Sequence, residues 1–291
     1  MFIAVQGGRA EYGIVPFENS SHGTVSFTLD GLADRAGVLG DVVVVGEVYL
    51  DVHHCLLGFP SPSSREGGAG EVRKEYGNEG DEKEWKGAPR TPLDHIHRVL
   101  SHPQAFGQTG VFSNKFLKGK ELVEVSSTSK AAEMAKGDET GQTAAVASEM
   151  AGEMTGLEVL ARWIEDREDN TTRFFVLRSL GSGDGEAREE QERAGGVGEE
   201  TKGYKSLVSF TVPHRRAGAL ADVLDCFRRR ELNLTSINSL PSLVEPFNYL
   251  FFVEFEGSRF NDSEGRVEAV FRDLDEVAER WRWLGSWERQ R

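Results

Sequence analysis

The amino-acid sequence predicts an α/β protein built in two parts. In residues 1–180, strand-like apolar runs alternate with segments of helical spacing, which is typical of layered α/β structures. In residues 203–291, six segments follow in the order β-α-β-β-α-β, the split arrangement of ferredoxin-like domains. We therefore expect a first domain over 1–180, a linker over 181–202 and a small second domain over 203–291.

The first clear strand signal is DVVVVGEVYLDVHHCLLG, residues 41–58. It is either one long extended stretch or two strands on either side of Gly46, and Val48, Leu50 and Val52 share one face. The remaining elements expected in this part are a helix over 104–117, a short helix over 130–137 that Ser127, Thr128 or Ser129 can cap, a strand over 143–148, a helix over 149–163 and an extended run over 170–177.

The last part gives the clearest pattern. Strands are expected over 206–212, 233–240, 248–255 and 282–287. A helix over 217–232 carries apolar residues at helical spacing, and a second helix begins near Ser263 with a longer stripe of the same kind. The stripes are Leu220, Val223, Leu224 and Phe227 in the first helix, and Val267, Val270, Phe271, Leu274, Val277, Ala278 and Trp281 in the second.

Two stretches, 61–92 and 181–202, are rich in Gly, Ser, Pro and charged residues and poor in large aliphatic ones. Such segments bury too little apolar surface to offset the entropy of ordering. We interpret the first as a flexible insertion within the first domain and the second as the interdomain linker.

The composition of the chain makes some classes of binding partner and cellular compartment improbable. The 291 residues carry a formal net charge of −14, which repels nucleic acid and anionic membranes, so an anionic substrate needs a locally basic pocket. Cys55 and Cys226 do not make a disulfide framework, which favours a reducing, cytoplasmic compartment. No apolar run approaches the roughly 20 residues that span a bilayer, and the first residues lack the features of a signal peptide.

Four polar segments lie where extended runs turn toward loops or helices. They are VPFENSSHGTV (15–25), SHPQAFGQ (101–108), SSTSKAA (126–132) and NTTRFFVL (170–177). Because ligands gather at the carboxyl ends of strands in α/β sheets, the four segments could form one site.

Each segment also has a purely structural interpretation. The ENS sequence is typical of an Asx turn, Ser127 and Ser129 of helix caps, Arg173 of a surface ion pair and His102 of a turn before proline. The pairs His53–His54 and His95–His97 lack a second pair of ligands, so we expect no metal site. Phosphate-binding and dinucleotide-binding glycine motifs and a nucleophile elbow are absent from the sequence.

Taken in order, GIVPFENSSHGTV, SHPQAFGQ and DNTTRFFVL, followed by a βαββαβ segment with GALADVLDCFRRRELNLTSI, resemble the prephenate dehydratase family. The resemblance covers nearly all of the chain outside the two polar stretches. It implies a catalytic domain with two subdomains, similar to type II periplasmic binding proteins, followed by a regulatory ACT domain.

The resemblance also implies a carbon–oxygen lyase of phenylalanine biosynthesis. Its substrate, prephenate, carries two carboxylates and a ring hydroxyl, and it loses the hydroxyl and CO₂ together to give phenylpyruvate. Aromatisation drives the reaction, so no cofactor or metal is expected. Thr172 and Arg173 are implied as the catalytic pair, the first at the departing hydroxyl and the second as a carboxylate clamp. The substrate-binding residues implied are Glu18, Asn19, Ser20, Ser101, Gln108 and Phe174.

The implied ACT domain suggests a phenylalanine effector and a homodimer or tetramer. Its effector-binding residues would be Gly218, Ala219, Leu220, Asn233, Leu234 and Thr235. Family members often carry E-S-R-P after the second strand, whereas this chain has Asn238-Ser239-Leu240-Pro241, so regulation by phenylalanine follows less directly than the fold.

The chain begins inside the stretch that usually follows a G-P-x-G-T-[FY]-S segment, so we expect that segment to be absent. Three alternatives to a prephenate dehydratase stay open: an arogenate dehydratase, a catalytically weak amino-acid-binding ACT protein and a solute-binding module.

Overall fold

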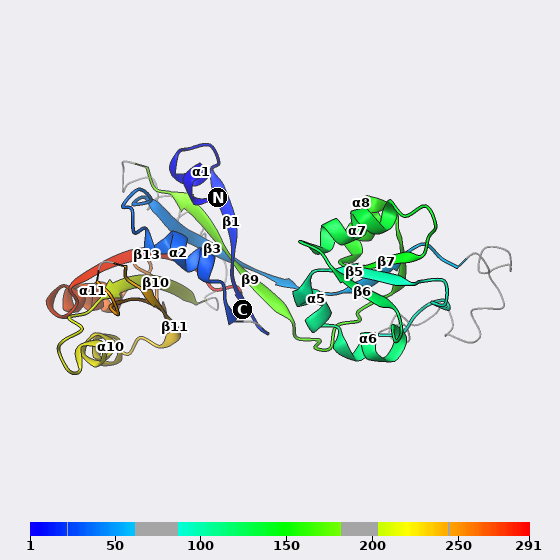
Figure 1. The fold of residues 1–291 in the computed structure, drawn as a ribbon. Coiled ribbons are helices and arrows are strands. Elements are labelled where there is room, and N and C mark those ends of the chain that lie inside the picture. Colours follow the sequence, from blue (N-terminus) through cyan, green and yellow to red (C-terminus); the bar gives the residue numbers. More distant parts are fainter. Residues whose placement is uncertain (22, 62–86, 182–202, 244) are drawn as a thin grey trace. The chain divides into compact units, whose positions relative to one another are not determined.

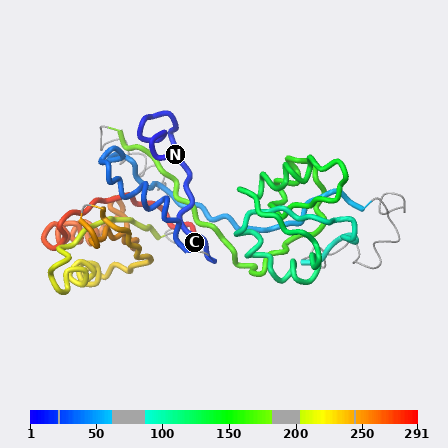
Figure 2. Tube along the Cα trace, in the orientation of Figure 1, coloured from blue at the N-terminus to red at the C-terminus, as the bar shows by residue number. Residues whose placement is uncertain are grey.

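The computed structural model describes residues 1–21, 23–61, 87–181, 203–243 and 245–291 (Figure 1). Most of the insertion expected at 61–92 and of the linker expected at 181–202 lies outside the described residues. The chain forms two compact units, one of Met1–Leu50 with Thr171–Arg291 and the other of Asp51–Asn170. The chain passes from one unit to the other at Leu50–Asp51 and returns at Asn170–Thr171. In the trace of Figure 2 the first passage is blue and the second green.

The first unit is built on an eight-stranded sheet with the order β11-β12-β10-β13-β3-β9-β1-β2. Its strands are β1 (Tyr12–Asn19), β2 (Gly23–Thr24), β3 (Val42–Asp51), β9 (Thr171–Ser179), β10 (Tyr204–Thr211), β11 (Leu234–Pro241), β12 (Tyr249–Glu256) and β13 (Arg280–Glu288). Its helices are α1 (Phe2–Gln6), α2 (Ser26–Ala33), α10 (Ala219–Arg229) and α11 (Arg266–Val277).

Strands β10 and β12 of this sheet are buried on both faces over most of their length. On one face, Val208 and Val253 pack under α10 and α11. On the other face, Leu207 and Phe252 share a core with Phe175 and with residues of β1, β3 and α2. Because successive side chains of a strand point to opposite faces, burial on both faces accounts for the nearly continuous apolar runs of β10 and β12.

The junction between the two halves of the sheet depends on one glycine. Strand β13 pairs with β3 in parallel at Gly285 and Val44. Gly285 has a φ of +138°, and a Cβ placed there would lie 2.0 Å from the carbonyl oxygen of Val44. No other residue fits so close to the neighbouring backbone, so glycine at 285 permits the continuous sheet.

The second unit holds a five-stranded sheet with the order β6-β5-β7-β4-β8. Its strands are β4 (Cys55–Gly58), β5 (Arg98–Ser101), β6 (Glu121–Glu124), β7 (Thr143–Ala147) and β8 (Glu158–Ala161). Its helices are α5 (Pro103–Gly107), α6 (Gly110–Phe116), α7 (Thr128–Lys136) and α8 (Glu149–Thr155). Strands β4 and β7 are fully buried, with one core on each face of the sheet.

The expected β-α-β-β-α-β order of the last part is confirmed as β10-α10-β11-β12-α11-β13. The strand at 143–148 and the helix at 130–137 are also confirmed, within one or two residues, as β7 and α7. The compact units are cut differently from the expected domains, because residues 1–50 and 171–180 pack with 203–291 in one sheet and one core.

Three expected elements differ. The extended stretch 41–58 forms β3 and β4, but it breaks at residues 52–54 and not at Gly46, which lies within β3. The helix expected over 104–117 is two short helices, α5 and α6, because the Asp166 carboxylate accepts hydrogen bonds from the N–H groups of Gly110 and Val111.

The helix expected over 149–163 ends at Thr155. Gly156 takes the left-handed conformation with φ +74°, which stops the helix, and Glu158–Ala161 continues as strand β8. Among the described helices, none is both long and apolar enough to cross a membrane.

Candidate active site

The first and last motifs meet where β1 and β9 end. The two strands run antiparallel side by side (Figure 1), and their register places Asn19 opposite Thr172. The side-chain amide of Asn19 donates a hydrogen bond of 3.0 Å to the Thr172 hydroxyl oxygen. Because a hydroxyl has one proton and two acceptor lone pairs, this contact orients Thr172 and leaves its proton available to donate.

The turn after β1 holds this pair in place. The backbone N–H of Ser20 donates to the Thr171 carbonyl at 2.9 Å, and the Thr171 N–H donates to the Ser20 hydroxyl at 3.0 Å. The Asn19 side-chain oxygen accepts from the Ser21 N–H at 3.0 Å, which is the Asx turn expected from the ENS sequence. Asn19 therefore shapes its own turn and contacts Thr172 with the other end of its amide.

Arg173 lies on the opposite face of β9 from Thr172. Strand alternation groups Arg173 with the buried Phe175 and Leu177, whereas Thr172 shares the half-buried face with Phe174. Glu18, which is half-buried, lies opposite Arg173 in the register of β1 and β9. The two residues expected to act as a catalytic pair thus leave the strand in different directions.

The Arg173 guanidinium is buried among charges of both signs. Its Nη2 lies 2.5 Å from Glu47 of β3 and 2.5 Å from Glu254 of β12. Lys205 of β10 lies 3.4 Å from Glu47 and 3.5 Å from Glu254. We call these four residues, Glu47, Arg173, Lys205 and Glu254, the charge cluster. Phe175 and Phe17 lie beneath the guanidinium, at 5.0 and 5.4 Å from its carbon.

The charge cluster shifts the ionisation of its members. Burial alone would raise the pKa of Glu47, but the Gln290 N–H and the positive charges of Arg173 and Lys205 outweigh it and lower that pKa. Burial likewise opposes the charged form of Arg173, but Glu254 and Glu47 outweigh burial and raise its pKa. Glu47 and Arg173 are therefore charged at neutral pH.

Ser101 and Gln108 belong to the second unit. The Ser101 hydroxyl is fully buried and donates to the Val146 carbonyl at 2.7 Å, which ties the end of β5 to β7. The Gln108 side-chain oxygen lies 2.7 Å from Nε2 of His54. His54 was not among the expected site residues; in the sequence it lay inside the extended stretch 41–58 and was considered only with His53 as a possible metal ligand.

The effector-binding residues expected by resemblance occupy two segments of the C-terminal part. Gly218 is the N-cap of α10 with φ +84°, and Ala219 and Leu220 form the first turn of that helix. Leu234 begins β11, and Thr235 lies at an irregularity of the β11–β12 pairing, where its hydroxyl donates 2.5 Å to Glu254. The Asn233 carbonyl accepts from the Glu256 N–H at 2.9 Å.

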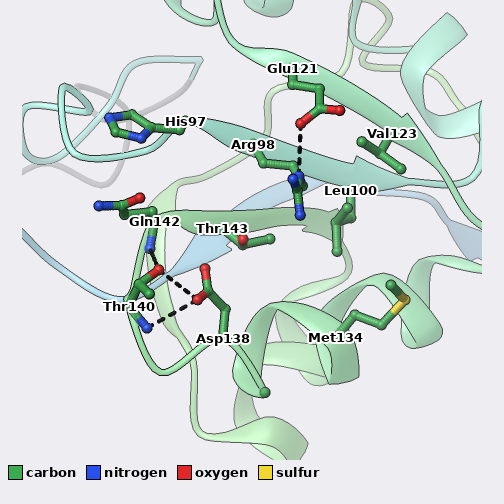
Figure 3. A pocket seen from close by; sticks show the side chains of 11 residues that line it. His97, Arg98, Leu100, Glu121, Val123, Met134, Asp138, Thr140, Gln142 and Thr143 are labelled. Atoms are coloured by element: carbon green, nitrogen blue, oxygen red, sulfur yellow. Dashed lines mark hydrogen bonds and ion pairs between the residues drawn. The ribbon is translucent and has the colours of Figure 1, made fainter.

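The second unit has a surface hollow of about 720 Å³ (Figure 3). It lies at the amino ends of β5 and β7, whereas Ser101 ends β5 at the carboxyl end. Arg98 and Glu121, which are neighbours in the pairing of β5 and β6, form an ion pair of 2.8 Å in its lining. Hydrogen bonds from Thr140 and Thr143 lower the pKa of Asp138 to about 2. None of the four motifs lines this hollow, so it is not the candidate active site.

Metal and thiol chemistry find no support among the described residues. They contain no group of three or more His, Cys, Asp and Glu placed to hold a metal ion. His53 instead binds Glu165 at 2.8 Å. Both cysteines are buried, and burial raises the pKa of Cys55 to about 11, so this thiol is protonated and inert.

Comparison with known proteins agrees with the motifs. The family model described as prephenate dehydratase matches residues 1–181. A bifunctional chorismate mutase/prephenate dehydratase of Aquifex aeolicus is 31% identical over 287 residues, which are 99% of this chain and 64% of the relative. Arogenate dehydratase 1 of Petunia hybrida is 30% identical over 98% of this chain and 58% of its own length. The chain thus spans less than two thirds of these relatives.

A solved structure gives the same result for the fold. The prephenate dehydratase of Arthrobacter aurescens in complex with L-Phe superposes with a TM-score of 0.73 at 26% identity. The match covers 99% of this chain and 78% of that one. Since the family model, the relatives and the solved structure agree, the chain belongs to the prephenate dehydratase family.

Proposed function

We propose that the chain catalyses the decarboxylating dehydration of prephenate to phenylpyruvate, water and CO₂. The observation that carries this proposal is the 3.0 Å hydrogen bond between Asn19 and Thr172. Two motifs far apart in the sequence place an oriented hydroxyl at the adjacent ends of β1 and β9. The departing hydroxyl has to lie near a hydrogen-bond donor, and an oriented hydroxyl supplies one.

The reaction gives each group a distinct task. Thr172 donates a hydrogen bond to the leaving hydroxyl while Asn19 fixes the Thr172 oxygen. The proton that turns the departing hydroxide into water comes from solvent through this hydroxyl, which is reprotonated as it donates and is unchanged at the end of the reaction. A preorganised donor of this kind lowers a barrier by roughly 3–4 kcal/mol. Loss of CO₂ leaves the electron pair that forms the aromatic ring, so the protein has no electrons to supply.

Neutral groups suit a dianionic substrate because they bind carboxylates without adding repulsion. We assign Ser20, Ser101, Gln108 and Phe174 to the surroundings of the substrate, and Glu18 to orienting its neighbours. Arg173 is the proposed carboxylate clamp, and its planar guanidinium suits bidentate binding. The guanidinium already pairs with Glu47 and Glu254 at 2.5 Å on the buried face of β9, so a substrate carboxylate would have to displace one of them.

We further propose that residues 1–50, 51–170 and 171–180 form the two-subdomain catalytic part, similar to type II periplasmic binding proteins. Residues 203–291 form an ACT module that binds L-phenylalanine. The βαββαβ order supports the second assignment, as does the L-Phe bound to the Arthrobacter relative. The strand β11 is at the edge of the sheet and supplies a surface for a second copy.

Arogenate is the second candidate substrate, because a relative named arogenate dehydratase is 30% identical over 98% of this chain. Arogenate carries an amino group where prephenate carries a keto oxygen.

The test is turnover of each compound by the purified full chain, followed through formation of phenylpyruvate or phenylalanine. We expect the larger kcat/KM with prephenate. A larger kcat/KM with arogenate would identify arogenate as the preferred substrate instead. If the chain converts neither compound, the proposal is contradicted.

A further inference from the structure

The charge cluster is formed by four strands of one sheet. Glu47 and Arg173 come from β3 and β9, whereas Lys205 and Glu254 come from β10 and β12 of the C-terminal segment. Two positive and two negative charges cancel, and each side chain is at most 7% exposed. Buried charges are tolerated only when they are paired, so the four side chains hold one another.

The hydrogen bonding of the Arg173 guanidinium is incomplete. Both carboxylates contact the same nitrogen, Nη2, and the buried Nε has no hydrogen-bond partner within the described part of the chain. A carboxylate binds a guanidinium best through two parallel N–H groups. An incoming carboxylate that paired with the Nε–H and a neighbouring Nη–H along one edge of the guanidinium would therefore bind Arg173 through two parallel hydrogen bonds.

Glu254 also contacts the segment that the family resemblance assigns to effector binding. One of its oxygens accepts from Arg173 at 2.5 Å, and the other accepts from the Thr235 hydroxyl at 2.5 Å. The irregular pairing between Leu234 and Ser236 sets the direction of the Thr235 side chain. A second contact joins the same strand to the first motif, because Thr24 donates to Asn238 at 2.7 Å.

We propose that Glu254 is a positioning residue whose ion pair with Arg173 competes with binding of an anionic substrate to Arg173. We propose also that the hydrogen bond from Thr235 to Glu254 links the strength of this ion pair to the effector segment. The inference rests on the proposed function. While Glu254 holds Arg173, a substrate carboxylate has to displace it. A ligand at residues 233–235 that changes the Thr235 contact changes the strength of that hold.

The test is Glu254→Gln in the full chain, with kinetics on prephenate and inhibition by L-phenylalanine. The variant leaves the cluster with one net positive charge, which attracts the dianion. We expect KM to fall by roughly three- to tenfold, with kcat within about twofold, and phenylalanine to inhibit less. Glu256→Gln on the same strand is the matched control, because its partly exposed carboxylate binds Arg289. The control should keep wild-type values.

Thr235→Val is the second variant, and it removes the hydroxyl without leaving a buried charge unpaired. It should weaken the phenylalanine response and lower KM to a smaller extent, and it decides the matter if Glu254→Gln does not fold. An unchanged or higher KM with an intact phenylalanine response would reduce the cluster to a packing role. Wild-type protein that leaves prephenate unconverted would refute the proposed function itself, and the inference with it.

Discussion

At the scale of single residues, the hydroxyl of Thr172 carries the proposed chemistry. Replacing Thr172 with alanine removes the donor, and we expect kcat for prephenate to fall by roughly 10²–10³-fold. Thr172→Ser keeps the hydroxyl within reach of Asn19 and should retain most of the activity. Steady-state kinetics with a melting curve for each variant check this. Equal loss in both variants would show that the methyl group, and so packing, matters instead.

The lowered pKa of Glu47 predicts that the stability of the folded protein depends on pH. Its folded pKa lies below its ordinary value of 4.5, so ionisation of Glu47 stabilises the folded state. That contribution is present above the ordinary value and is lost as the pH falls through the lowered folded pKa. In Glu47→Gln, the free energy of unfolding should therefore decline less steeply on acidification than in the wild type.

Urea titrations from about pH 6 to about pH 3 measure this slope. Glu133→Gln, at an exposed pair with Lys130, controls for the loss of one surface charge. Parallel slopes for Glu47→Gln and the wild type would contradict the account.

The sequence pointed to the contact between Asn19 and Thr172 but not to the partners of Arg173. Motif resemblance identified the residues, and the antiparallel register of β1 and β9 brings Asn19 and Thr172 together. The partners of Arg173 were not predicted, because Glu47 and Glu254 come from strands far away in the sequence. Alternation within TTRFFVL already placed Arg173 on the same face as Phe175 and Leu177, which was the available signal for its burial.

At the scale of elements, the start of α6 depends on a distant carboxylate. Thr109, its N-cap, makes no side-chain cap, and the Asp166 oxygens instead accept from Gly110 at 2.9 Å and Val111 at 2.8 Å. Asp166→Ala should lower the free energy of unfolding by roughly 1–2 kcal/mol. Asp169→Ala is the control, because its pair with Arg167 is exposed. Chemical denaturation that gives equal losses for the two variants would rule out the cap.

Elements with a strong local pattern were predicted close to their observed bounds, except that α11 ends at Val277, so Trp281, which was expected in its stripe, lies in β13. Helices α10 and α11 each bury a stripe of regularly spaced apolar residues, and small buried residues mark β7. The failures lie where a non-local group or a single glycine decides. Asp166 divides the helix expected at 104–117, and the left-handed Gly156 ends α8 before the β-forming run at 158–161.

At the scale of the whole molecule, the continuity of the eight-stranded sheet depends on Gly285. Gly285→Ala puts a methyl group 2.0 Å from the Val44 carbonyl, so β13 and β3 have to separate. Gly257→Ala is a close control, since Gly257 has nearly the same φ, +137°, but its nearest contact is a Val267 side-chain atom at 3.0 Å. We expect a loss of stability larger by roughly 2 kcal/mol or more at 285.

Thermal melts of both variants measure this difference, and comparable melting temperatures would contradict the assigned role of the junction.

The sequence did not predict the junction. Local patterns in the sequence predict the elements but not which sheet edges pair with each other, so 203–291 was expected as a domain separate from 1–180.

The most direct test of the central claim is a double-mutant cycle on prephenate turnover with Asn19→Ala, Thr172→Ala and the double variant. If Asn19 acts by orienting the Thr172 hydroxyl, Asn19→Ala alone should lower kcat/KM by roughly tenfold or more. The same substitution made in the Thr172→Ala variant should change kcat/KM by less than about twofold, because the hydroxyl is already absent. Fully additive losses would show that the two residues act independently and would contradict the account.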